Sequence, residues 1–178
     1  MRQIPQHSVN AIITSRPYAI HFKKEYGNVD KRDYVKWFLP FAEGVKRILK
    51  ADGSFVLNIG GSHNPNIPTR SLYQFKLLIA LCEEVGFHLA QEFFWYNPAE
   101  LPAPAEWVNV RRIRVKDSVE YIWWLSPSPW PAADNRAVLA PYSADMERII
   151  KRGLSGDQTA TTLLQNSNGT SAAQFPPT

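Results

Sequence analysis

The chain has 178 residues, of which 44% are hydrophobic and 20% are charged, a composition that fits one globular domain and excludes a collagen-like or wholly disordered protein. Its 20 Lys and Arg against 16 Asp and Glu give a formal net charge of +4, which permits a polyanionic partner without requiring one. A single cysteine, Cys82, and the lack of a signal-like or membrane-length apolar run predict a cytoplasmic protein without a membrane partner.

The first predicted elements are a strand, a helix and a second strand. Residues 9–14 form an apolar, β-branched run that predicts a buried strand ending at Ser15. Apolar residues at offsets of three and four predict an amphipathic helix after Asp33, a plausible N-cap, with Pro40 inside it. Asp52-Gly53 is predicted to stop that helix, and residues 54–59 read as the second buried strand.

The remaining pattern repeats this alternation. A helix is predicted over residues 71–85, closed by Gly86, followed by strands over residues 87–96 and 118–125. Strands that alternate with helices indicate crossover connections. We therefore predict an α/β fold with a mostly parallel sheet and flanking helices.

Two loops follow the first two predicted strands, where ligands bind in open parallel sheets. Thr14 to Tyr18 combine a serine hydroxyl, a proline-restricted backbone and an aromatic ring, which could together hold a flat polar ring. The alternative is a plain strand-to-helix turn with Tyr18 in the core. The second loop, Gly60-Gly61-Ser62, could cradle a phosphate, but it lacks the lysine of a P-loop and the third glycine of a dinucleotide-binding motif.

Two clusters of basic residues could contact a nucleic acid. Arg111, Arg112, Arg114 and Lys116 fall within seven residues, and Lys23 and Lys24 belong to a second cluster. Either cluster could contact phosphates, and either could be a solvated surface. The four histidines share no ligand spacing with one another or with Cys82, so no metal site is predicted.

Four blocks of the sequence resemble the DNA amino-methyltransferases. Ser15-Arg16-Pro17-Tyr18, after its strand, is similar to the Ser-Pro-Pro-Tyr motif of enzymes that act on the N(4) amine of cytosine. Residues 53–60, 95–98 and 101–126 then follow in the family's order. The arrangement resembles permuted type II restriction-modification enzymes, in which the catalytic half precedes the cofactor half. The resemblance covers about residues 5–150.

This resemblance implies a Rossmann-like methyltransferase fold that uses S-adenosylmethionine and acts on double-stranded DNA. Ser15 and the Arg16 carbonyl would accept hydrogen bonds from the target amine, and Tyr18 would stack on the flipped base. Pro17 would hold the catalytic loop extended, and Thr14 and Ser15 would border the cofactor. The target-base pocket would be lined by Gly60, Gly61 and Ser62, and the DNA backbone would be contacted by Lys23, Lys24, Arg111, Arg112, Arg114 and Lys116.

The sequence departs from the family at two points. Arg16 stands where the family has proline, and a further positive charge at ~4 Å from a cationic transition state costs about 1 to 4 kcal/mol. The family's Phe-x-Gly-x-Gly cofactor segment does not occur in the 178 residues.

The departures predict an incomplete methyltransferase domain. We expect its catalytic half in residues 1–126, the start of a recognition or connecting region in residues 127–152, and a flexible polar tail in residues 153–178. A separate chain could carry the cofactor half. The alternatives are a non-catalytic remnant that binds DNA or a partner chain, and an adenine-N(6) DNA methyltransferase.

Overall fold

The computed structural model describes residues 3–15 and 29–151 of the chain. Residues up to Ala133 and residues from Asp134 form two separate units. In the second unit, the described residues form a short 3-10 helix, η2 (Asn135–Val138), and the exposed helix α3 (Ala144–Lys151). Within the described residues, no helix is both long enough and apolar enough to cross a membrane.

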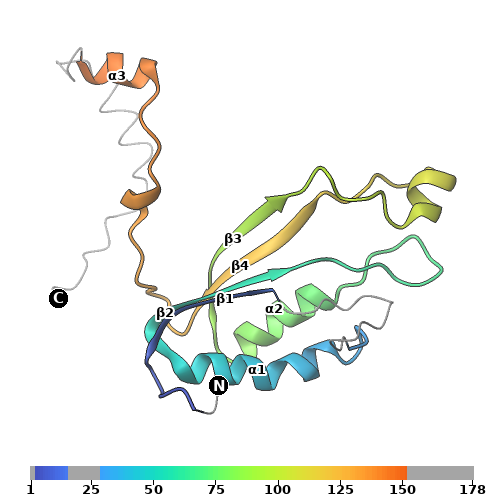
Figure 1. Ribbon diagram of the computed structural model, residues 1–178, viewed down its shortest axis with the longest axis horizontal. Helices are drawn as coiled ribbons and strands as arrows, with labels where there is room; N and C mark the ends of the chain where they lie inside the picture. Colours follow the sequence, from blue (N-terminus) through green and yellow to red (C-terminus); the bar gives the residue numbers. More distant parts are fainter. Residues whose placement is uncertain (1–2, 16–28, 152–178) are drawn as a thin grey trace. The chain divides into compact units, whose positions relative to one another are not determined.

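A four-stranded sheet is the framework of the first unit (Figure 1). Its strands, β1 (Val9–Ser15), β2 (Leu49–Ile59), β3 (His88–Tyr96) and β4 (Val119–Ser126), lie in the order β1-β2-β4-β3. β1 is parallel to β2, whereas β4 is antiparallel to both of its neighbours. The predicted α/β class is therefore confirmed, but the sheet is mixed rather than mostly parallel over the described strands.

The antiparallel pairing follows from the connection between β3 and β4. A parallel return needs a crossover that is usually an α-helix. Here the connection leaves the sheet as an extended arm, residues 97–118. Among these described residues, the one regular element is the five-residue π-helix η1 (Glu106–Val110). Figure 1 shows the arm projecting beyond the ends of β3 and β4 with η1 at its far end, so β4 returns beside β3 in the opposite direction.

Two helices, α1 (Tyr34–Ile48) and α2 (Tyr73–Glu83), cover one face of this sheet (Figure 1). Their apolar faces bury Phe38 and Leu77 against Phe55 and Leu57 of β2 and Trp123 of β4. Each such side chain contributes about 1.5–3 kcal/mol when it leaves water. The core therefore lies between the helices and the sheet.

The start of β2 differs from the prediction. α1 ends at Ile48 and β2 begins at once at Leu49, so Asp52-Gly53 lies inside the strand and does not stop the helix. Val9 pairs with Leu49 and Ala11 with Ser54, which leaves extra residues of β2 in a bulge. Gly53 fits there because an added Cβ would lie 3.1 Å from the carbonyl oxygen of Asn10.

The two helices are also joined by a charged side chain. The Lys46 ammonium of α1 donates hydrogen bonds to the carbonyl oxygens of Val85 (2.6 Å) and Gly86 (2.8 Å), just after α2. A cation at this position complements the negative end of the α2 dipole. Gly86 has φ +75° and closes the helix as predicted, because glycine adopts this left-handed conformation without a Cβ clash.

Candidate functional site

The carboxyl ends of β1 and β2 meet at one edge of the sheet. Parallel pairing sets Thr14 beside Leu57 and Ser15 beside Asn58. The exposed Ser15 hydroxyl donates a hydrogen bond to Asn58 Oδ1 at 3.3 Å. The strand carrying the serine motif and the strand leading into Gly60-Gly61-Ser62 therefore end side by side. The sequence places Asn58 at the start of the segment Asn58-Ile59-Gly60-Gly61-Ser62 after the second strand, but no role was predicted for it.

Several predicted site residues lie outside the described residues. These are Arg16, Pro17 and Tyr18 of the catalytic loop and Lys23 and Lys24 of the following basic cluster. Their roles, like those of Thr14 and Ser15 toward base and cofactor, stay predictions.

The Gly60-Gly61-Ser62 loop is packed against α2 and Arg70. The Tyr73 hydroxyl donates a hydrogen bond to the Gly60 carbonyl oxygen, and the Ser71 amide donates one to the carbonyl oxygen of the buried Ser62 at 2.8 Å. A Cβ added to Gly61 would lie 1.9 Å from Arg70 Nη2. Gly61 thus makes room for a guanidinium group, and the predicted role of this loop in a base pocket stays a prediction.

Arg70 joins this loop to the base of the arm. Its Nη1 lies 2.7 Å from Asp117 Oδ1, in the segment just before β4. His63 Nε2 lies 3.5 Å from the other oxygen of Asp117. Burial lowers the pKa of His63, and the opposing attraction of Asp117 is the smaller effect. The cluster of Arg70, Asp117 and His63, which we call the arm anchor, was not predicted from the sequence, because Asp117 lies 47 positions from Arg70.

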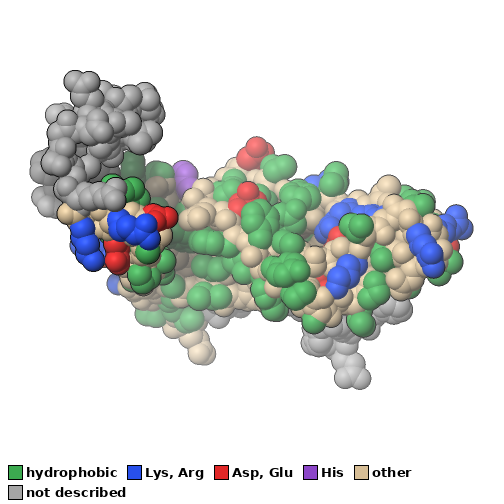
Figure 2. Space-filling model, turned by 90° about the horizontal axis from the view of Figure 1, so that it is seen from above, with side chains coloured by type: hydrophobic (Ala, Val, Ile, Leu, Met, Phe, Trp, Pro, Cys, Tyr) green, Lys and Arg blue, Asp and Glu red, His purple; other side chains and the backbone are tan. Residues whose placement is uncertain are grey.

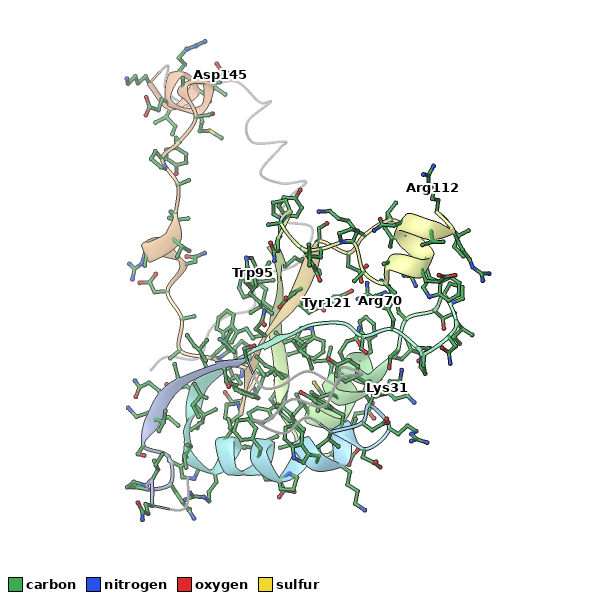
Figure 3. The ribbon with its side chains drawn as sticks, turned by 45° about the vertical axis from the view of Figure 1, so that its right-hand side comes forward. Lys31, Arg70, Trp95, Arg112, Tyr121 and Asp145 are labelled. Atoms are coloured by element: carbon green, nitrogen blue, oxygen red, sulfur yellow. The ribbon has the colours of Figure 1, made fainter. Side chains whose placement is uncertain are left out.

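Two further cations fasten the same loop. The Lys31 ammonium donates to the His63 carbonyl oxygen (2.9 Å) and to Asn64 Oδ1 (3.1 Å). Arg114 Nη1 of the arm donates to the Pro68 carbonyl oxygen at 2.9 Å. Figure 3 places Arg70 near the sheet end of the arm and Lys31 on the helix side. The loop after β2, the arm and the segment before α1 are therefore held together.

The basic block of the arm, Arg111 to Lys116, contains cations of two kinds. Anchored cations interact with other described residues of the protein, and unpaired cations do not. Arg111 Nε lies 2.7 Å from Glu106 Oε1, and its guanidinium lies 5.1 Å from the Trp107 ring centroid. Lys116 donates to the Pro98 carbonyl oxygen at 2.5 Å. With Arg114 bonded to Pro68, three of the four cations in this block interact with other residues of the protein.

Arg112 is different. The structure gives its side chain no hydrogen bond or ion pair to any other described residue, and its backbone has φ +55°. Figure 3 shows the side chain at the far end of the arm, pointing away from the chain. A non-glycine residue in this conformation costs about 1 kcal/mol or more and is often found at functional sites. The geometry presents one guanidinium to solvent beyond η1.

The family model described as DNA methylase matches residues 9–176. The Type II methyltransferase M.PvuII of Proteus hauseri is 49% identical over 151 residues, which are 85% of this chain and 45% of that protein. M.SfiI of Streptomyces fimbriatus, also a Type II methyltransferase, is 30% identical over 123 residues, covering 58% of this chain and 29% of that protein. The solved PvuII DNA methyltransferase, described as cytosine-N4-specific, has a TM-score of 0.71 and 41% identity over 98% of this chain and 62% of that chain.

These comparisons identify the family of the chain. The chain spans less than half the length of the curated relatives named here, and its fold is part of a methyltransferase domain. The family match includes β1 and β2, whose ends carry Ser15 and Asn58, as well as the arm. The chain therefore belongs to the DNA methylase family.

Proposed function

We propose that this chain supplies the catalytic half of a site-specific DNA methyltransferase that acts on the N(4) amine of cytosine. The observation that carries this function is the hydrogen-bonded pair Ser15 and Asn58 at the carboxyl edge of β1 and β2, in a chain 49% identical to a Type II methyltransferase. The solved relative described as cytosine-N4-specific favours cytosine over adenine.

The hydrogen bond of Ser15 supports a role for its hydroxyl in this chemistry. Because Ser15 donates its proton to Asn58 Oδ1, the lone pairs of its oxygen can accept a hydrogen bond from an amine. S-adenosylmethionine, when bound, supplies an electrophilic methyl group. The cytosine nitrogen forms the new N–C bond as the S–C bond breaks, and the thioether leaves with the electron pair. The nitrogen becomes positive before it loses a proton, so an acceptor at Ser15 stabilises the transition state more than the ground state.

The described residues fit one side of a methyl-donor site. Thr14 and Ser15 end β1 with two hydroxyl side chains, half-buried and exposed respectively. They would border the donor where it faces the target base. The rest of its site would come from the cofactor half, carried by a longer protein or by a separate chain.

The arm would hold double-stranded DNA. Arg112 would contact a phosphate, whereas Arg111, Arg114 and Lys116 interact with Glu106 and with backbone carbonyls of the protein. Phosphate contacts fix the register of a protein on DNA without reading its sequence. The arm anchor would keep this contact at a fixed distance from the Ser15 edge. The reaction would take place in the cytoplasm, as the single cysteine predicts.

The test is a methylation assay with a complemented enzyme. The chain is co-expressed with the part of M.PvuII that it does not match, and host DNA is analysed by nucleoside mass spectrometry. We expect N4-methylcytosine, lost on Ser15→Ala and retained on Ser8→Ala. Ser8 is a matched control because it precedes β1 and its hydroxyl donates to the Pro5 carbonyl oxygen.

Other products would identify the alternatives. N6-methyladenine alone would indicate an adenine enzyme. DNA binding without any methylated nucleoside, with the two chains shown to associate, would indicate a non-catalytic remnant. Equal yields from the Ser15→Ala and Ser8→Ala variants would remove Ser15 from the site.

A further inference from the structure

Glu120, near the start of β4, lies on the same face of the sheet as Ser15. Directly paired residues share a face of a sheet, and faces alternate along each strand. Ser15 pairs with Asn58, and Asn58 pairs with Ile122. Trp123, the residue after Ile122, is buried in the core on the helix side. Ile122, and with it Glu120 two residues earlier, therefore faces the side opposite α1 and α2, as does Ser15.

Glu120 also lies at the same edge of the sheet. β4 is antiparallel to β2, so its first residues stand beside the last residues of β2, and Ile59 pairs with Tyr121. Glu120, one position earlier in β4, therefore lies beside Gly60, where the second loop begins. Asn58 and Glu120 are then diagonal neighbours, which are about 7–8 Å apart in antiparallel sheets and within reach of long side chains. The Glu120 carboxylate is thus within reach of the Asn58 side chain, which accepts the hydrogen bond of the serine hydroxyl.

The Glu120 side chain has a partly apolar environment. Glu120 is half-buried, and its direct partner on β3 is Trp95. Figure 2 views this face of the sheet and shows acidic side chains set among hydrophobic ones over the strands. Partial burial strengthens electrostatic effects because less water screens the charge. Burial raises the pKa of the Glu100 carboxyl in the arm, and the negative charges of Glu120 and Asp117 raise it further. The charge of Glu120 therefore acts beyond β4, at the base of the arm.

The proposed reaction requires a group that can take up a proton. The cytosine nitrogen is positive after methyl transfer and becomes neutral only when it loses one of its protons. Ser15 and Asn58 cannot hold this proton, because a neutral hydroxyl and a neutral amide are very weak bases. A carboxylate accepts a proton readily, and general bases in enzymes act within hydrogen-bond reach of the proton or through one water molecule. Glu120 supplies a carboxylate on the face and at the edge where Ser15 and Asn58 stand.

Resting on the proposed function, we propose that Glu120 is a catalytic residue, the general base that removes the proton from the methylated amine of the target cytosine. The N–H bond breaks and its electron pair stays on nitrogen, which becomes neutral. The proton forms an O–H bond with the carboxylate, directly or through one water molecule, and is later released to solvent. Before this step, the negative charge of Glu120 stabilises the positive charge that develops on nitrogen in the transition state. Removing the charge therefore lowers the rate more than the affinity for DNA.

The test compares two isosteric substitutions in the complemented enzyme described above. Glu120→Gln removes the carboxylate. Glu92→Gln is the matched control, because Glu92 is an exposed glutamate of the same sheet whose pairing with Trp123 places it on the helix side. Single-turnover formation of N4-methylcytosine is measured at saturating DNA, and thermal melting verifies folding. We expect Glu120→Gln to lower the rate about tenfold or more with a DNA affinity within about twofold, and Glu92→Gln to change neither by more than about twofold.

A second variant separates proton transfer from a purely structural role. Glu120→Ala leaves space beside Gly60 in which a small carboxylate can bind. Added formate should raise the rate of Glu120→Ala at least several-fold and leave the rate of the unmodified enzyme unchanged, because formate replaces the missing base. A residue that only supports the fold would not respond to formate.

Two results would overturn this assignment while leaving the proposed function standing. They are equal rates of N4-methylcytosine formation by the Glu120→Gln and Glu92→Gln variants, and a slow Glu120→Ala variant that formate does not accelerate. Failure of the proposed function is recognised separately. The absence of any methylated nucleoside from the unmodified complemented enzyme would contradict both the function and the role of Glu120.

Discussion

Replacing Gly61 with alanine tests the arm anchor. The added methyl would lie 1.9 Å from Arg70 Nη2 and 3.1 Å from its Cζ, so the guanidinium has to move. No backbone atom is among the three nearest contacts, and the side chain of Arg70 can rotate away. The movement breaks its 2.7 Å contact with Asp117, so the expected cost is the free energy of that ion pair.

The magnitude follows from the exposure of the pair. The Arg70 and Asp117 side chains are 33% and 26% exposed, so water weakens their attraction, and a loss of about 1 kcal/mol is reasonable. For a first unit of 133 residues, an unfolding entropy of about 2.1 cal/mol/K per residue converts this into a lowering of Tm by about 4 °C.

A double-mutant cycle identifies the cause. In an Arg70→Ala background the space beside Gly61 is empty, so Gly61→Ala should then cost almost nothing, giving a coupling energy of about 1 kcal/mol. Thermal melting of the two single variants and the double variant supplies the free energies. Equal destabilisation by Gly61→Ala in both backgrounds would show that the loop backbone, and not Arg70, excludes the methyl group.

Four further results are expected. Arg112→Ala should reduce the slope of log affinity for duplex DNA against log salt by about one, while Arg111→Ala changes it less; equal effects would contradict the distinction between anchored and unpaired cations. Calorimetry of the chain alone should show weak or no binding of S-adenosylmethionine, and micromolar binding at one site would contradict the need for a cofactor half. Arg16→Pro in a complemented enzyme should raise the rate of single-turnover methylation by roughly thirtyfold if ~2 kcal/mol of charge repulsion is removed from the transition state. An unchanged rate would show that the Arg16 guanidinium lies away from the reacting atoms. The pKa of His63 is lower in the folded chain than its ordinary value of 6.5. The neutral imidazole therefore contributes stability above pH 6.5, and this contribution is lost as the pH falls through the lower pKa of the folded chain. Between pH 7 and pH 5 the Tm of the unmodified chain should fall more than that of a His63→Gln variant, and parallel curves of Tm against pH would refute this.

The sequence predicted the elements of the sheet unit well because their apolar patterns are local. The predicted strand ending at Ser15 and the helix closed by Gly86 agree closely with β1 and α2. Local pattern failed where long-range pairing determines the result. Asp52-Gly53 reads as a helix stop, yet these residues lie in the β2 bulge because Val9 and Ala11 pair on either side of it.

Strand direction and the arm anchor could not be predicted from local sequence patterns either, because both depend on residues that are distant in the chain. Apolar runs show that residues 118–125 are a strand, but they do not show that β4 lies between β2 and β3 and runs antiparallel to both. Arg70 and Asp117 are 47 positions apart, and neither residue type indicates its partner. The catalytic loop and the roles of the basic residues came from family resemblance, which names functions but could not show that Arg111 and Arg114 bond to the protein.

The contact of Lys46 with the end of α2 has a consequence for how the helical layer opens. Its ammonium satisfies two carbonyl groups at the terminus where a helix normally frays first. Local unfolding of α1 would withdraw that donor and expose the end of α2, so neither helix can open without weakening the other. In native-state hydrogen exchange, the two helices should therefore behave as one cooperative unit, with amide protons that share an opening free energy.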